Sequence, residues 1–211
     1  IKLYTPYRMV AWDLLFYYAI IYLFLTIEKK ITPAEVMQFD AFYILFKFCM
    51  QIPCTILIDR IGKRKSLIIA NFTLAIHILV IIFAPNFEML LVSQILCAFS
   101  YIIKATCETD MLYEALEKGE KRGGIFAKID GKTSSYYYYL DAITAVAAGF
   151  LFTVNAYIPM FLCFIVLMIS FFISIKFEEV EERKKKITKK EEFKNLKIAS
   201  RNNLRSKPIR N

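Results

Sequence analysis

Charged and polar side chains recur at helical spacing inside apolar stretches of this 211-residue chain. Asp40, Lys47 and Gln51 are spaced so that an α-helix places them within about 40° of one another, on a single face. An ionisable side chain at the centre of a bilayer costs about 2.5–3.5 kcal/mol on insertion scales, so it normally faces protein or water. The stripe therefore predicts a helix face that contacts a polar solute or an ion.

A second polar stripe lies further along the chain. Its members, which share one helix face, are Thr133, Tyr137, Asp141, Thr144 and Ala148. Lys47 and Asp141 lie nearest the middle of their apolar segments, so they are the leading candidates for contact with substrate or ion. Tyr137, Gln51 and Asp40 are further candidates on the same two faces. Two structural alternatives remain open: Lys47 snorkels to the interface, or it forms a permanent bridge with Asp141.

The segments that position these stripes have the composition of a membrane protein. Hydrophobic residues make up 57% of the chain, against about 45–50% in soluble domains. About 20 apolar residues cross the hydrocarbon core as a helix. Six such helices are predicted, at 9–27, 38–58, 66–84, 88–106 (continuing toward 117), 134–154 and 157–176. The predicted fold is an all-α, polytopic bundle over 1–177, followed by a basic tail over 178–211.

Basic residues are concentrated in alternate connections. The connection after the second segment contains Arg60, Lys63, Arg64 and Lys65, and the connection after the fourth is also basic. The positive-inside rule then places both chain ends in the cytoplasm. The net charge of +9 is concentrated in the tail beside a hydrophobic body, which favours anionic lipid headgroups over nucleic acid as its partner.

Several chemistries lack their signatures in the sequence. The five cysteines form no C-x-x-C pair and His77 is the single histidine, so neither a metal site nor a disulfide framework is predicted. The chain has no H-E-x-x-H motif and no phosphate-binding glycine-rich loop. No enzymatic activity and no cofactor are expected.

Residues 55–64, which read TILIDRIGKR, lie between the second and third segments. They resemble the loop between helices two and three of the major facilitator superfamily, G-x-L-x-D-R-x-G-R/K-R/K. The matching positions are Leu57, Asp59, Arg60, Gly62, Lys63 and Arg64, and the departure is Thr55 in place of the first glycine.

The resemblance implies the N-terminal half of a twelve-helix transporter, built from inverted three-helix repeats. Helices one, two, four and five would line the transport path. Asp59, Arg60, Gly62, Lys63 and Arg64 would form a cytoplasmic gating loop. Its partner would be Asp110 on the fourth helix, with Glu108 or Glu114 as alternatives.

The resemblance implies secondary active transport of a small solute by alternating access, coupled to an ion. Efflux is one such activity. A C-terminal six-helix half would follow in the same chain or come from a partner copy, in a prokaryotic inner membrane. Two departures weaken proton antiport: the helix-five motif is reduced to Ala148-Gly149, and the fourth helix lacks an arginine. A cavity that contains Lys47, Asp141, Tyr137 and Gln51 would suit an amphipathic or zwitterionic solute. The alternative is a non-transporting membrane protein: a scaffold, a receptor or a truncated remnant.

Overall fold

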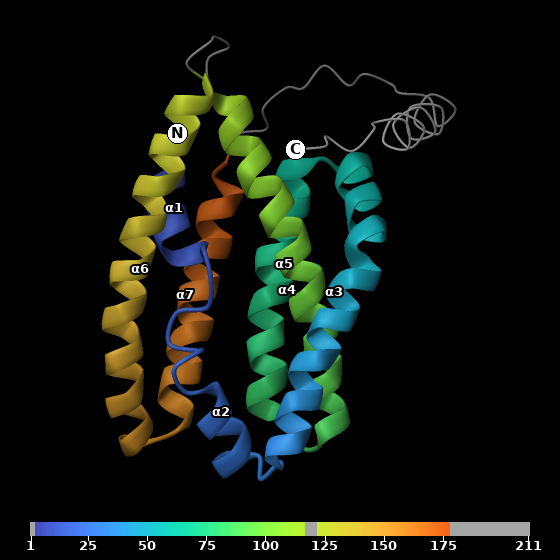
Figure 1. Ribbon diagram of the computed structural model, residues 1–211, viewed down its shortest axis with the longest axis vertical. Coiled ribbons are helices and arrows are strands. Elements are labelled where there is room, and N and C mark those ends of the chain that lie inside the picture. Colours follow the sequence, from blue (N-terminus) through green and yellow to red (C-terminus); the bar gives the residue numbers. More distant parts are fainter. Residues whose placement is uncertain (1–2, 117–121, 178–211) are drawn as a thin grey trace, which may run out of the picture. The chain divides into compact units, whose positions relative to one another are not determined.

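The structure is a computed structural model that describes residues 3–116 and 122–177 (Figure 1). The predicted tail at 178–211 lies outside the described residues. The elements in chain order are α1 (Tyr4–Ala11), α2 (Ile21–Leu23), the π-helical turn η1 (Phe24–Glu28), α3 (Pro33–Ile61), α4 (Lys63–Phe83), α5 (Phe87–Ala115), α6 (Arg122–Val154) and α7 (Tyr157–Ile175). All regular structure in the described part is helical.

Five of these helices, α3 to α7, are long and apolar enough to cross a membrane. They coincide with the second to sixth predicted segments, and α3, α5 and α6 extend beyond them. Local polar side chains determine where two of them begin. Thr32 and Glu35 form a capping box at the start of α3, and the side chain of Asn86 accepts the N–H of Met89 at 3.1 Å at the start of α5.

The first predicted segment differs from the prediction, because the continuous helix expected over 9–27 is divided. α1 ends at Ala11 and α2 begins only at Ile21, with bends and turns over 12–20. Phe16 has a φ of 65°, in the left-handed region, where a right-handed helix cannot continue. The expected six helices are therefore five continuous helices and one divided segment.

Side chains satisfy backbone groups that the division leaves without helical partners. The carboxylate of Asp13 accepts the N–H of Leu14 at 2.9 Å. The ammonium of Lys104, on α5, donates to the carbonyl of Ala11 at 2.5 Å. Because unpaired backbone groups are costly in a membrane, these contacts make the division tolerable at bilayer depth. Hydropathy reports only that the segment is apolar, so it could not reveal the division.

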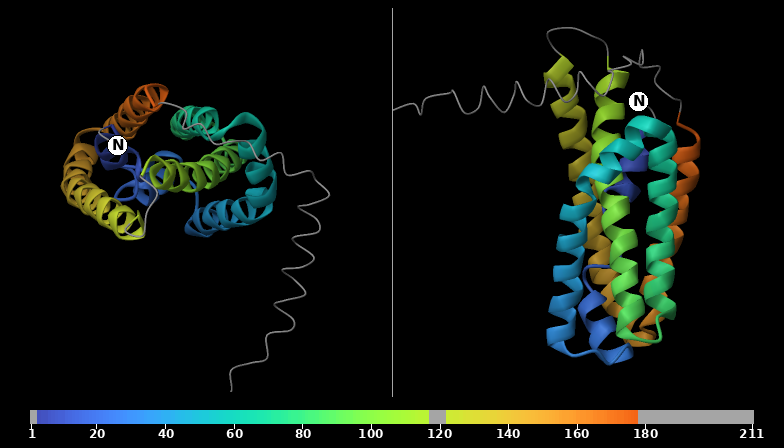
Figure 2. Two further views of the ribbon diagram at one scale, coloured as in Figure 1. Left: turned by 90° about the horizontal axis from the view of Figure 1, so that it is seen from above. Right: turned by 90° about the vertical axis from the view of Figure 1, so that its right-hand side faces the viewer.

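α5 lies in the interior of the described bundle, while α3 and α6 lie on opposite sides of it (Figure 1, Figure 2). α4 packs against α5 and α7, α3 packs mainly against α5, and α6 packs against α1 and α7. The two outer helices bury few side chains. Those of α3 are Val36, Phe39, Cys54 and Ile58, and those of α6 are Thr133, Tyr137, Thr144 and Ala148. Most of both helices is therefore available to lipid, water or another protein segment.

A single residue joins α3 to α4. α3 ends at Ile61, α4 begins at Lys63, and Gly62 between them has a φ of 96°. Residues with a Cβ rarely adopt this conformation. The sequence motif that reads as a loop is therefore a one-residue turn, with its charged residues in the flanking helical turns.

Replacing Gly62 by alanine is expected to lower the free energy of unfolding by about 1–2 kcal/mol, because the turn requires a left-handed conformation. Denaturation of the purified protein in mixed micelles measures the change. The matched control is Gly131→Ala, because a Cβ at Gly131 would meet no atom within 4 Å. Gly131 lies within α6, where alanine should stabilise by about 0.5–1 kcal/mol. Equal effects at the two positions would contradict this account of the turn.

Candidate functional site

The division of the first segment presents a carboxylate, Asp13, to side chains from its own segment and from α5. The Tyr101 hydroxyl donates to Asp13 Oδ1, and the Tyr18 hydroxyl donates to the same oxygen at 3.0 Å. The two hydroxyls lie 3.2 Å apart. Within the described part of the chain, no lysine or arginine lies within 4.0 Å of the Asp13 carboxylate. Its negative charge is thus held by neutral donors.

Aromatic rings extend from this carboxylate in two directions. Toward α6, the Trp12 ring stacks on Tyr137 with centroids 6.3 Å apart and lies 6.5 Å from Tyr138. Toward α3, the ring of Tyr101 makes an edge contact with Tyr43 at 6.1 Å. We name the set around Asp13 the aromatic rim; its members are Trp12, Tyr18, Tyr43, Tyr101 and Tyr138.

The residues predicted to line a path occupy different environments. Tyr137 is 3% exposed and packs inward, whereas Asp141 one turn away is half-buried. Lys47, Gln51 and Asp40 are exposed on α3. The structure therefore brings Tyr137 and Asp141 close to the first segment and leaves the α3 stripe open.

The alternative of a structural bridge between Lys47 and Asp141 is not realised among the described residues, where the two form no ion pair. The Lys47 ammonium lies 5.4 Å from the centre of the Tyr43 ring instead. Asp141 lies one helical turn from Tyr137, whose ring stacks on Trp12 beside Asp13. Two carboxylates, Asp13 and Asp141, thus lie in this region, and Lys47 lies at its edge.

A buried network of charges holds α1 against α5 and α6. Glu108 on α5 pairs with Arg8 and accepts the Tyr7 hydroxyl at 2.7 Å. Asp130 on α6 lies 3.5 Å from Arg8, and Lys104 lies 4.0 Å from Glu108. Two positive and two negative groups balance one another, which a buried cluster requires.

Sequence reasoning missed two of these residues as site candidates. Arg8 lies just outside the first predicted span, so it was not recognised as a membrane-embedded charge. Asp13 lies within the first predicted segment and was not among the candidate site residues. The signal that pointed toward both was the polar face of α5, on which Tyr101, Lys104 and Glu108 recur at helical spacing.

The residues that match the superfamily loop motif lie at the α3–α4 turn. Lys63 lies 3.2 Å from Asp110 and also pairs with Glu114, both on α5. Arg64 donates to the carbonyl of Ile175 at 2.7 Å, at the end of α7. Asp59 and Arg60 are exposed, with side chains available beyond the bundle. Asp110, the expected partner of the motif, therefore contacts it, and so does the alternative Glu114. The other alternative, Glu108, belongs to the buried network. A gating role for these residues stays a prediction.

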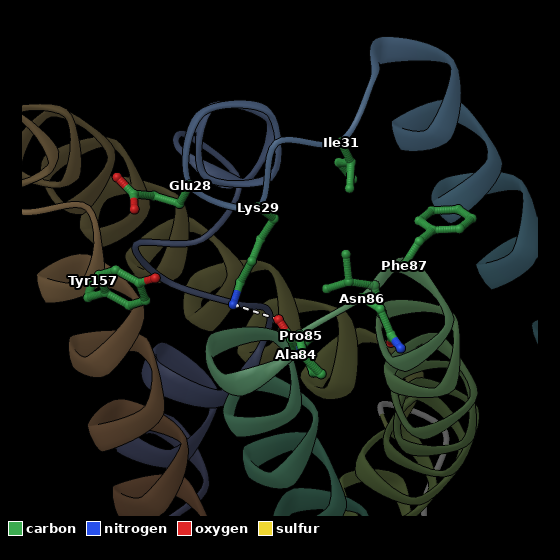
Figure 3. Close-up of a pocket in the computed structure, with 9 residues that line it drawn as sticks. Glu28, Lys29, Ile31, Ala84, Pro85, Asn86, Phe87 and Tyr157 are labelled. Atoms are coloured by element: carbon green, nitrogen blue, oxygen red, sulfur yellow. Dashed lines mark hydrogen bonds between the residues drawn. The ribbon is translucent and has the colours of Figure 1, made fainter.

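A pocket lies at the opposite end of the bundle from the α3–α4 turn (Figure 3). Lys29 enters it and donates to the carbonyls of Ile82 at 2.6 Å and Ala84 at 3.0 Å. Burial lowers the pKa of Lys29 from its ordinary value. Because its ammonium binds the last carbonyls of α4, it stabilises that helix end and is not free to bind a ligand.

The single histidine and four of the five cysteines are buried. His77 is fully buried and its Nδ1 lies 2.8 Å from the Ser93 carbonyl oxygen, which suits a packed, neutral histidine. All five cysteines are free thiols. The described residues contain no group of three or more histidine, cysteine or acidic side chains arranged to hold a metal ion.

Glu108→Gln is expected to lower the free energy of unfolding by about 3 kcal/mol, because it leaves Arg8 buried with only Asp130 as a partner. Thermal unfolding of the purified protein measures the loss. Asp110→Asn is the matched control: its side chain is 46% exposed, so its removal should cost less than about 1 kcal/mol. Losses of equal size would show that the buried network contributes no more than the surface contact.

Comparison with known proteins identifies the family. The family model described as Major Facilitator Superfamily matches residues 9–210 of the chain. A search of curated proteins finds no match. The family match spans the α3–α4 turn, the aromatic rim and the break in the first segment, and it begins just after Arg8. Members of this family are generally membrane transporters, so a membrane-embedded bundle with charged groups at depth agrees with the match. The chain belongs to the major facilitator superfamily of membrane transporters.

Proposed function

We propose that this chain is the N-terminal half of a twelve-helix secondary active transporter, which moves a small solute by alternating access and couples it to an ion gradient. The observation that carries the proposal is the difference between two sides of the bundle. The exposed side chains of α7 form an apolar stripe, Phe161, Ile165, Ile169 and Phe172. The region between α3 and α6 instead contains Asp13, Asp141 and Lys47.

An apolar stripe suits contact with lipid, whereas ionisable side chains at bilayer depth suit a water-filled cavity. The small number of buried residues on α3 and α6 supports a second six-helix half that packs against these helices. The polar groups between α3 and α6 would then line the cavity between the halves, which is where transporters of this architecture bind their solutes.

The charge contacts support movement of this half as a rigid body. α5 is joined to α1 through Glu108 and Arg8, and to α4 through Asp110 and Lys63. The single-residue turn at Gly62 allows little independent motion of α3 and α4. Asp59 and Arg60 are exposed, so we assign them to contacts with the second half that form in one state and break in the other.

The proposed location is a prokaryotic inner membrane, with the α3–α4 turn on the cytoplasmic side. The support is the concentration of lysine and arginine at that turn and in the tail. Both chain ends would then be cytoplasmic, and the basic tail would connect the two halves near anionic lipid headgroups.

The accessibility of an introduced thiol tests the water-filled face. Tyr138 on α6 and Ile165 on α7 are 60% and 51% exposed. In a full-length protein whose native cysteines are replaced by serine or alanine, Tyr138→Cys should react with a membrane-impermeant maleimide at least tenfold faster than Ile165→Cys. The reason is that maleimides react with the thiolate, which forms in water and not in lipid.

Vesicles of both orientations show whether access alternates. Labelling of the cysteine at 138 from each side supports a cavity that opens both ways, whereas labelling from one side supports a fixed cleft. If the cysteine at 138 reacts no faster than the one at 165, the face contacts lipid and the transport proposal fails.

The size of the native gene product tests the proposal of two halves. An antibody raised against residues 178–211 should detect, in the native membrane, a protein of about twice the 24.7 kDa of this chain. A product of 24.7 kDa would favour a six-helix protein that acts as a scaffold or receptor, or that completes its cavity with a second copy.

A further inference from the structure

Asp13 is a carboxylate at bilayer depth whose charge has no positive partner in contact. Its hydrogen-bond donors are the hydroxyls of Tyr101 and Tyr18 and the backbone N–H of Leu14. All three are neutral. An ionised carboxylate away from bulk water is stable only when its charge is compensated, so this site is chemically suited to receive a positive group.

The surrounding charges make the region more attractive to a cation. Lys104 lies behind Asp13, where it is 2% exposed, and its ammonium is bonded to the Ala11 carbonyl. On the open side, Asp141 adds a second negative charge within electrostatic range of Asp13. Lys47 is at the far edge, over Tyr43. The region beside Asp13 therefore contains two partly exposed carboxylates, Asp13 and Asp141, and one exposed lysine, Lys47.

The aromatic rim offers ring faces around this carboxylate. Tyr18 and Tyr138 are 55% and 60% exposed, whereas rings of this size are usually more buried in a packed core. The face of an aromatic ring attracts cations, and cages of such rings recognise quaternary ammonium groups. A carboxylate among exposed rings is thus a fitting environment for a large, weakly hydrated cation.

The chain's own cations already lie over two rings of the rim. The guanidinium carbon of Arg8 lies 3.6 Å from the centre of the Trp12 ring, and the Lys47 ammonium lies 5.4 Å from the centre of Tyr43. Within the described residues, no cation lies over Tyr18 or Tyr138. Two rings of the rim thus already bind cations, while the exposed rings of Tyr18 and Tyr138 are open.

We propose that Asp13 and the aromatic rim bind the positively charged group of an organic cation, and that organic cations are the substrate class of this transporter. This inference rests on the proposed function and adds the chemistry of its solute. The zwitterionic solute suggested by the sequence rested on the presence of both Lys47 and Asp141 in one cavity, whereas in the structure Lys47 lies over Tyr43, at the edge of the rim. An anionic solute would be repelled by both carboxylates.

Equilibrium binding of tetraphenylphosphonium to the purified full-length transporter in lipid nanodiscs tests the proposal. Tetraphenylborate, which has the same shape and the opposite charge, is the matched probe. We expect saturable binding of tetraphenylphosphonium and at least a tenfold rise in its Kd on Asp13→Asn. Tetraphenylborate should bind without saturation, and Asp13→Asn should not weaken that binding. Non-specific partition into lipid is the same in both protein variants, so the difference between them isolates the site.

Two further variants keep the test decisive. Glu88→Gln removes an exposed carboxylate in the first turn of α5, outside the rim, and should leave the Kd unchanged. Tyr138→Leu removes one exposed ring and should raise the Kd severalfold, which provides an answer even if Asp13→Asn fails to fold. An unchanged Kd in both Asp13→Asn and Tyr138→Leu, or equal saturable binding of tetraphenylborate, overturns the cation proposal.

The outcomes also separate this inference from the proposed function. If the cysteine at 138 is labelled from both sides but neither Asp13→Asn nor Tyr138→Leu changes the Kd of tetraphenylphosphonium, the transporter stands and the cation assignment falls. If the cysteine at 138 is not labelled, the water-filled cavity itself is refuted, and binding of tetraphenylphosphonium then gives no support to transport.

Discussion

The attachment of the first segment to α5 is the interaction on which the rest of the structure depends. Three residues on one face of α5 hold successive parts of that segment: Glu108 binds Arg8, Lys104 binds the Ala11 carbonyl, and Tyr101 binds Asp13. Without these partners, the charges of the first segment and the backbone of its division would be unsatisfied within the membrane. The same contacts that make the fold tolerable also determine where Asp13 is presented.

This arrangement divides the charged residues into two groups. The first is buried, balanced in charge and bonded on several sides, as at Glu108 and Arg8, and it maintains the bundle. The second is partly exposed and unbalanced, as at Asp13 and Asp141, and it is the group to which our proposals assign contact with a solute. A charge at membrane depth is often taken as functional, but its partners and exposure decide to which group it belongs.

The sequence predicted the positions of α3 to α7 well, because long apolar segments and capping residues such as Thr32 and Asn86 report on local structure. It also anticipated the contact of Asp110 with the motif, through resemblance. It did not predict the division of the first segment, because hydropathy is insensitive to backbone conformation. It left a bridge between Lys47 and Asp141 open, because spacing along a helix gives the face of a residue, whereas its partner across the bundle depends on how the helices pack.

The division also has a consequence for how the protein enters the membrane. The first segment leaves the ribosome before α5 has been synthesised, so Tyr101, Lys104 and Glu108 are not yet present to satisfy its broken backbone. At that stage an unbroken helix is the form that a bilayer tolerates. We therefore expect the segment to enter the bilayer as one helix and to unwind between Ala11 and Ile21 when α5 packs beside it. In such a late conformational conversion, a helix already in the lipid would exchange some of its own hydrogen bonds for those of a neighbour.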